Sequence, residues 1–202
     1  MHDRWSLASV ARPRLADYRT VRGEIRSGDV MLFRRQPGRP SGRLIAVAGR
    51  GVHCHAAMAA WWDDRLMALE TVQFVGGRAV LLSHLVQQNA GRIDVFAIAE
   101  APAGFDRRAA VDAMKTIAGR SYGWWSLLCC GLTHVPALRL LMPPQLDDTI
   151  DGSLPFCSMA VAAALRRAGV DPVPNLADRL TEPGDLARSA VLEYQFTLVV
   201  SS

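Results

Sequence analysis

The sequence contains almost no lysine and no block of basic residues, although its formal net charge is +4. Lys115 is the one lysine among 23 basic residues, and the arginines are dispersed from Arg4 to Arg188. A nucleic-acid-binding groove normally concentrates basic residues and places aromatic side chains between them. The composition therefore argues against a nucleic-acid partner.

Paired cysteines are also lacking. The four cysteines, Cys54, Cys129, Cys130 and Cys157, form no CxxC pair, and adjacent cysteines are poorly placed to form a disulfide with each other. No apolar leader segment follows Met1. We therefore expect a reducing compartment, which is the cytoplasm by default or the interior of a larger particle that carries the protein.

No segment is apolar for long enough to predict a transmembrane helix. The most apolar stretch, 124–142, reads WWSLLCCGLTHVPALRLLM and is interrupted by His134, Pro136 and Arg139. A membrane span requires about 20 mostly apolar residues, and a charge at its centre is costly. We interpret the stretch as a buried helix pair, a lid over a pocket, or a surface that docks a protein or a lipid.

The remaining pattern is that of one globular domain. Half of the residues are hydrophobic and 21% are charged, which is ordinary for a folded chain. Short apolar strands bounded by turns fill the first half, and most helical segments, such as 106–119, follow them. This order predicts an α+β fold. We expect an N-terminal arm or helix at 1–22 and a single domain at 23–202, with an apolar insertion around 124–155.

Cys157 stands near the start of a segment with the pattern of a helix, FCSMAVAAALRRAG. Alanine is the strongest helix former, Gly169 occupies the expected C-terminal cap, and the two nearby arginines complement the helix dipole. At the opposite end, unpaired backbone N–H groups and partial positive charge favour a thiolate. Cys157 is thus either an activated nucleophile or, as most free cysteines are, a small buried hydrophobic residue.

A predicted hairpin places a histidine close to a glutamate. The segments VHCHAAMAAWW and RLMALETVQF have the character of strands and flank Asp63–Asp64. With the two aspartates as the turn, His55 faces Val72 and is the diagonal neighbour of Glu70 on the same side of the sheet. Diagonal Cα atoms lie about 7–8 Å apart, a distance that a glutamate side chain can bridge to an imidazole.

The two residues before His55, His53 and Cys54, are less well placed than His55 to interact with Glu70 in the predicted hairpin. His53 shares the face of His55 but lies one step farther from Glu70, so it is the second choice for a catalytic base. Cys54 points to the opposite face, which argues against a metal site built from the HCH triplet. We expect neither a metal nor a cofactor.

An imidazole oriented by a carboxylate, beside a thiolate at a helix N-terminus, is the arrangement of a nucleophilic triad. Cys157, His55 and Glu70 are the candidates for its nucleophile, its base and its orienting acid. The alternative is that His55 is an ordinary core histidine and Glu70 an edge residue.

Six motifs carry a resemblance to a known family: GDVMLF, HAAM, MALET, SYGWW, FCSMAV and GDLARS. In this order, across residues 28–189, they resemble the YiiX/YebB-like family, a circularly permuted branch of the NlpC-type papain-like cysteine peptidases and amidases. The resemblance implies a permuted papain-like fold, in which an antiparallel strand meander packs against a Cys-bearing helix. It also implies that Cys157 is the nucleophile, His55 the general base and Glu70 its partner, with Tyr122 near the substrate.

The activity implied by this resemblance is thiol-dependent hydrolysis of a peptide-like amide, such as a cell-wall peptide. Two alternatives stay open. The same chemistry could serve a lipid acyltransferase or thioesterase, with the acyl chain along 124–142. The chain could also be a non-catalytic structural module of a larger assembly, such as a phage particle.

Overall fold

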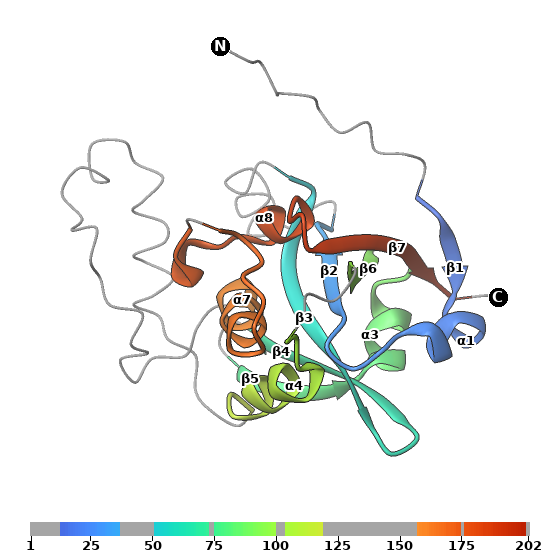
Figure 1. The fold of residues 1–202 in the computed structure, drawn as a ribbon. Helices are drawn as coiled ribbons and strands as arrows, with labels where there is room; N and C mark the ends of the chain where they lie inside the picture. The colour runs from blue at the N-terminus through green and yellow to red at the C-terminus, as the bar shows by residue number, and fades with distance from the viewer. Residues whose placement is uncertain are drawn as a thin grey trace, which may run out of the picture.

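A computed structural model describes residues 13–36, 51–72, 75–99, 104–118, 157–174 and 176–200. Its centre is a seven-stranded sheet accompanied by helices, so the α+β fold expected from the sequence is confirmed (Figure 1). Tyr122, the expected insertion at 124–155 and the first 12 residues of the expected N-terminal arm lie outside the described residues.

The described sheet is antiparallel except at one edge. Its strand order is β1-β7-β6-β2-β3-β4-β5, and β1 pairs with β7 in parallel. Strands β2 to β5 are neighbours in chain order and form an antiparallel meander, as the sequence predicts. The strands are β1 Leu15–Asp17, β2 Val30–Arg34, β3 His53–Trp62, β4 Arg65–Val72, β5 Gly76–Leu81, β6 Ile93–Ile98 and β7 Leu192–Val199.

Helices lie against both faces of the sheet. Residues of α4 and α7 join one buried cluster, and residues of α3 join a second cluster on the other face. No helix among the described residues combines the length and the apolar character needed to cross a membrane. The helices are α1 Tyr18–Val21, η1 Arg22–Glu24, α3 Leu82–Gln88, α4 Arg107–Lys115, α7 Cys157–Arg167, η2 Asp178–Leu180 and α8 Pro183–Ala187.

The β3–β4 hairpin has the register that the sequence predicts. Trp62 pairs with Arg65 across the two-residue turn, and the ladder continues without a shift to Ala57 and Glu70. Asp63 adopts a φ of 53°, a left-handed conformation that aspartate tolerates better than most residues and that tight hairpin turns require. The turn therefore fixes which residues of β4 lie beside which residues of β3.

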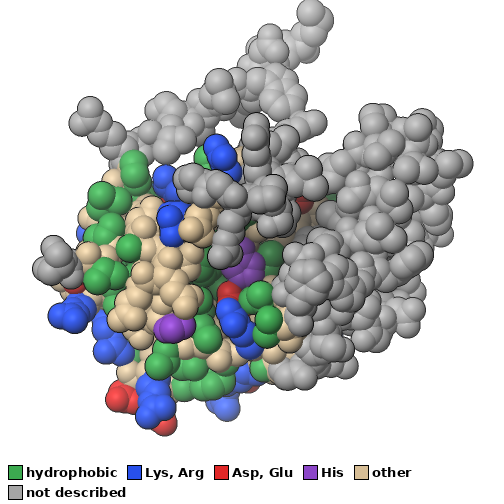
Figure 2. All heavy atoms as spheres, turned by 180° about the vertical axis from the view of Figure 1, so that it is seen from behind, with side chains coloured by type: hydrophobic (Ala, Val, Ile, Leu, Met, Phe, Trp, Pro, Cys, Tyr) green, Lys and Arg blue, Asp and Glu red, His purple; other side chains and the backbone are tan. Residues whose placement is uncertain are grey.

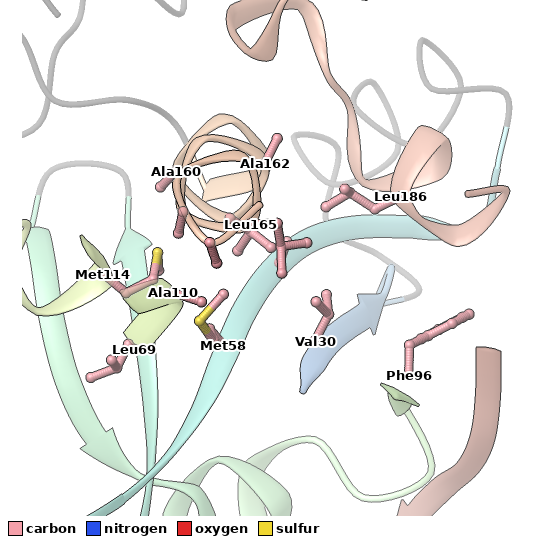
Figure 3. Close-up of a cluster of buried hydrophobic side chains, with 14 of the residues drawn as sticks. Val30, Met58, Leu69, Phe96, Ala110, Met114, Ala160, Ala162, Leu165 and Leu186 are labelled. Atoms are coloured by element: carbon pink, nitrogen blue, oxygen red, sulfur yellow. The ribbon is translucent and has the colours of Figure 1, made fainter. Parts of the chain in front are cut away.

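Helix α7 packs closely on the sheet because half of its buried residues are alanine. Ala160 and Leu165 of α7 and Met58 of β3 belong to the same fully buried cluster, as Figure 3 shows. Small side chains let the helix axis approach the strand, and each buried apolar side chain gains roughly 25 cal/mol per Å² removed from water. This packing brings α7 into contact with β3.

The far end of α7 closes as the sequence predicts. Arg166 and Arg167 lie in its last turn, and Gly169 follows with a φ of 91°. The Gly169 N–H donates to the Arg166 carbonyl at 3.0 Å, and Arg166 also pairs with Asp178. A left-handed glycine beyond the last turn is a common helix end.

Charged side chains are dispersed on the face of the protein that Figure 2 shows. Figure 2 shows that Lys and Arg side chains on that face lie among hydrophobic ones and do not gather into one patch. The dispersed distribution in space follows the dispersed distribution in the sequence.

Gly77 occupies a position in β5 where the backbone of another segment approaches closely. A Cβ at this residue would lie 2.1 Å from the carbonyl oxygen of Ile117. We expect Gly77→Ala to lower the free energy of unfolding by about 1–3 kcal/mol, since backbone must shift to relieve the overlap. Urea denaturation measures this change. Gly23→Ala is the matched control, because nothing lies within 4 Å of its Cβ position, and an equal loss in both variants would contradict the prediction.

Candidate active site

Cys157 is the first residue of α7, where the backbone N–H groups of the first turn have no partner within the helix. Its sulfur accepts hydrogen bonds from the backbone N–H groups of Ser158 and Ala56. Burial alone raises the pKa of the Cys157 thiol. The positive charge of His55 and the hydrogen bonds from His55, Ala56 and Ser158 outweigh burial, so the pKa of Cys157 lies below its ordinary value.

The sulfur reaches β3 because the β3–β4 ladder ends early. Pairing between the two strands stops at Ala57 and Glu70. The Ala59 N–H donates to the Asp29 carbonyl on the β2 side, so by alternation the Ala56 N–H points to the β4 side. There it meets the Cys157 sulfur instead of a strand. The thiol therefore lies at the open end of the ladder, next to His55.

His55 connects the thiol to a carboxylate. Its Nε2 lies 2.6 Å from Oε2 of Glu70, and its ring also hydrogen-bonds Cys157. Since Nε2 is used by Glu70, Nδ1 is the nitrogen that remains for the sulfur. Burial alone would lower the pKa of His55. The negative charge of Cys157 and its hydrogen bond, together with those of Glu70, raise the pKa of His55 to about 10.

The structure thus brings together the three residues that the sequence singled out. Cys157 comes from the start of α7, His55 from the start of β3, and Glu70 from near the end of β4. The fourth site residue, Tyr122, lies outside the described residues.

Arg78 is a functional candidate that the sequence reasoning missed. It lies directly opposite Glu70 on the edge strand β5, and its Nε and Nη2 lie 2.8 and 2.6 Å from Oε1 of Glu70. Burial by itself raises the pKa of Glu70, but His55 and Arg78 together hold that pKa below its ordinary value. The available signal was the β4–β5 hairpin, because pairing Val72 with Gly76 sets Glu70 against Arg78.

His53 does not share the face of His55, contrary to the expectation from simple alternation. Phe33 pairs with His55 and Arg34 pairs with His53, so β3 carries one extra residue at this point. Phe33 and Arg34 are consecutive in β2, so their side chains point to opposite faces of the sheet. Their partners, His55 and His53, therefore also point to opposite faces. This bulge explains why His55 packs edge-to-face on Phe33 whereas His53 packs edge-to-face on Phe96.

His53 belongs to a separate polar group. Its Nε2 lies 2.7 Å from Oδ2 of Asp94, which also receives Arg34 Nε at 2.7 Å, and Thr197 donates to the other carboxylate oxygen. The group joins β2, β3, β6 and β7. Among the described residues, His53 is not a hydrogen-bond or charge partner of Cys157 or of Glu70.

The described residues do not fit a metal ion. No three His, Cys, Asp or Glu side chains among them come close enough to ligate one. His53 and His55 are each paired with a carboxylate, and these carboxylates, Asp94 and Glu70, each also contact an arginine. A cation would have to displace these guanidinium groups, so we derive no chemistry from a metal.

The pKa shifts predict the reactivity of Cys157 toward iodoacetamide. An ordinary thiol is only about 0.3% ionised at pH 6. We expect the alkylation rate of Cys157 to be at least about tenfold above that of a model thiol at pH 6, with no inflection near pH 8.5. Peptide mapping by mass spectrometry identifies the labelled residue.

Cys54 is the internal control for this experiment. Burial and, secondly, the negative charge of Cys157 raise the pKa of the Cys54 thiol, so Cys54 should stay protonated and unlabelled at pH 6. His55→Ala should slow the labelling of Cys157, because it removes the charge that stabilises the thiolate. Labelling of Cys54 before Cys157 would contradict the assignment.

Comparison with known proteins adds one finding about the fold. No family model and no curated protein matches the sequence. Among solved structures, the chain is similar to the crystal structure of the metalloprotein yiiX from Escherichia coli O157:H7, DUF1105. The TM-score is 0.57 with 11% sequence identity, and the similarity covers 86% of this chain and 97% of that chain. The chain therefore shares the α+β fold of yiiX over most of its length.

Proposed function

We propose that the protein is a thiol hydrolase of the permuted papain-like type, with Cys157 as nucleophile, His55 as general base and acid, and Glu70 as the residue that orients His55. The observation that carries the proposal is one continuous hydrogen-bonded chain. It runs from a cysteine at a helix N-terminus to a histidine and on to a buried carboxylate at 2.6 Å. These are the parts of a nucleophilic triad in their functional order.

The first half of the reaction forms a thioester. The Cys157 thiolate attacks the carbonyl carbon of an amide, and the carbonyl oxygen takes the negative charge. The backbone N–H of Cys157, at the start of α7, is a suitable donor to this oxyanion. Protonated His55 then gives its proton to the amide nitrogen, the C–N bond breaks, and the amine leaves.

The second half regenerates the enzyme. Neutral His55 takes a proton from water, and the resulting hydroxide attacks the thioester carbonyl. The C–S bond breaks, the carboxylic acid is released, and the thiolate–imidazolium pair forms again. Glu70 keeps its hydrogen bond to Nε2 throughout, so that Nδ1 faces the sulfur in both halves.

The proposed substrate is a peptide-like amide, such as a cell-wall peptide. This choice rests on the resemblance of the ordered motifs to the YiiX/YebB-like peptidases and amidases. The shared fold with yiiX agrees with that resemblance and carries no information on the substrate. The segment that would line an acyl channel in the acyltransferase alternative, 124–142, lies outside the described residues.

We expect Cys157→Ala and His55→Ala each to reduce kcat/KM at least about 100-fold, since each removes a group that bonds to or transfers a proton with the reacting atoms. Fluorogenic peptide amides, including cell-wall stem peptides, are the substrates. His53→Gln is the matched control. It keeps a hydrogen-bonding group beside Asp94 and has no described contact with Cys157, so it should retain most of the activity.

Two outcomes would overturn this assignment. Equal losses in His53→Gln and His55→Ala, with both variants folded by circular dichroism, would contradict His55 as the base. Transfer of an acyl group from a thioester or phospholipid substrate, with no cleavage of any amide, would contradict the amidase in favour of an acyltransferase. Mass spectrometry of the acyl-enzyme distinguishes an amidase from an acyltransferase, because the mass of the group on Cys157 identifies it as a peptide acyl group or a fatty acyl group.

A further inference from the structure

Glu70 is a carboxylate in an environment that opposes its charge. Its side chain is 2% exposed, and burial raises its pKa. A buried carboxylate stays ionised only when charged partners and hydrogen bonds compensate for the lost hydration. Both of its oxygens are in use, Oε2 by His55 and Oε1 by Arg78.

His55 alone does not neutralise this carboxylate at every step, because the charge of His55 changes during the proposed reaction. In the proposed reaction the imidazole is protonated before it gives its proton to the leaving group and neutral afterwards. Whenever His55 is neutral, Glu70 would be a buried anion without a counter-charge and would tend to take a proton. An arginine keeps its positive charge at every pH relevant to proteins, so it does not change during the reaction.

We propose that Arg78 is a positioning residue of this site, which keeps Glu70 ionised and directed at His55 through the whole reaction. The proposal rests on the proposed function, because it assigns Arg78 a role in that same reaction. Two donors of one guanidinium converge on Oε1, and this leaves Oε2 free to face the imidazole. The charges then alternate along Cys157, His55, Glu70 and Arg78.

The backbone of β5 is well placed to hold Arg78. Glu70 and Arg78 are directly opposite in a regular ladder that runs from Met67–Leu81 to Val72–Gly76. The preceding residue, Gly77, forms a bridge to Ala118 and lies under the Ile117 carbonyl. The Arg78 side chain is 38% exposed, whereas the Glu70 side chain is 2% exposed. Water therefore reaches the guanidinium but not the carboxylate that it contacts.

The test is the pH dependence of Cys157 alkylation and of kcat/KM in Arg78→Met and Arg78→Lys. An opposite charge at this distance lowers a carboxyl pKa by about 1–3 units. We expect Arg78→Met to move the acid limb of both profiles to higher pH by about one unit or more, which is about a tenfold loss of rate on that limb. Arg78→Lys keeps the charge and should leave the acid limb near its wild-type position. Arg108→Met, at a side chain that is 91% exposed on α4, is the control and should change neither profile.

A double variant tests the link between Arg78 and Glu70 directly. His55 and Arg78 contact different oxygens of Glu70, and an amide has one oxygen and one NH2 group. In Glu70→Gln one of the two donors therefore faces the NH2 group, and we expect a loss of activity. In the Arg78→Met background the amide oxygen is free to face His55. The loss in Glu70→Gln/Arg78→Met should therefore be smaller than the product of the two single losses.

The outcomes separate this proposal from the function on which it rests. If wild-type Cys157 reacts no faster than a model thiol, the proposed function fails. If wild-type Cys157 is reactive but the acid limb of Arg78→Met stays in place or moves to lower pH, Arg78 is not a positioning residue. Multiplicative losses in the double variant would overturn the proposal in the same way. If Arg78→Met does not fold, the same pH profiles of alkylation and kcat/KM are compared between Arg78→Gln, which lacks the charge, and Arg78→Lys, which keeps it. A shift of the acid limb in Arg78→Gln alone supports the proposal, and no shift overturns it.

Discussion

The hydrogen bond between His55 and Glu70 depends on the register of β3 against β4. The two residues belong to adjacent strands and are diagonal neighbours, so a slip of one residue would move Glu70 to the other face of the sheet. The Asp63–Asp64 turn prevents such a slip by fixing the pairing of Trp62 with Arg65. The early end of the same ladder leaves room for the Cys157 sulfur. One hairpin thus sets both the orientation of His55 and the access of Cys157 to it.

Every ionised group in the site is stabilised by the next one along the chain of contacts. Burial opposes the charged form of Cys157, of His55 and of Glu70. Each charge is retained because a neighbour of opposite sign lies in hydrogen-bond contact with it, and interactions are stronger where water is excluded. The site therefore acts as a unit, in which the loss of any one charge weakens the others. The lowered pKa of Cys157 is a property of the whole arrangement and not of Cys157 alone.

The sheet contains two groups that each join a histidine, a carboxylate and an arginine, in different surroundings. His55, Glu70 and Arg78 form one, and His53, Asp94 and Arg34 form the other. The bulge in β3 separates them by turning the two histidines to opposite faces. The group around Glu70 contacts a thiol, whereas the carboxylate of Asp94 is satisfied by Arg34, His53 and Thr197 and ties four strands together. Residue type alone does not distinguish a histidine–carboxylate pair that contacts a thiol from one that only joins strands.

Local patterns in the sequence determined the α+β class, the start and end of α7 at Cys157 and Gly169, and the β3–β4 register. Each of these depends on residues close to one another in the chain, where helix caps, turn residues and strand period act directly. The pairing of His55 with Glu70 follows from that register, because both lie on one hairpin.

The tertiary structure alone decided the rest. Cys157 meets His55 only because α7 docks on the sheet, about a hundred residues after β3, and His53 pairs with an aspartate from β6, 41 residues away. The bulge beside Cys54 depends on how β2 and β3 align across a long connection, and the contact of Arg78 with Glu70 depends on the β4–β5 alignment. Contacts of this kind are set by the packing of whole elements against one another, which no short-range periodicity specifies.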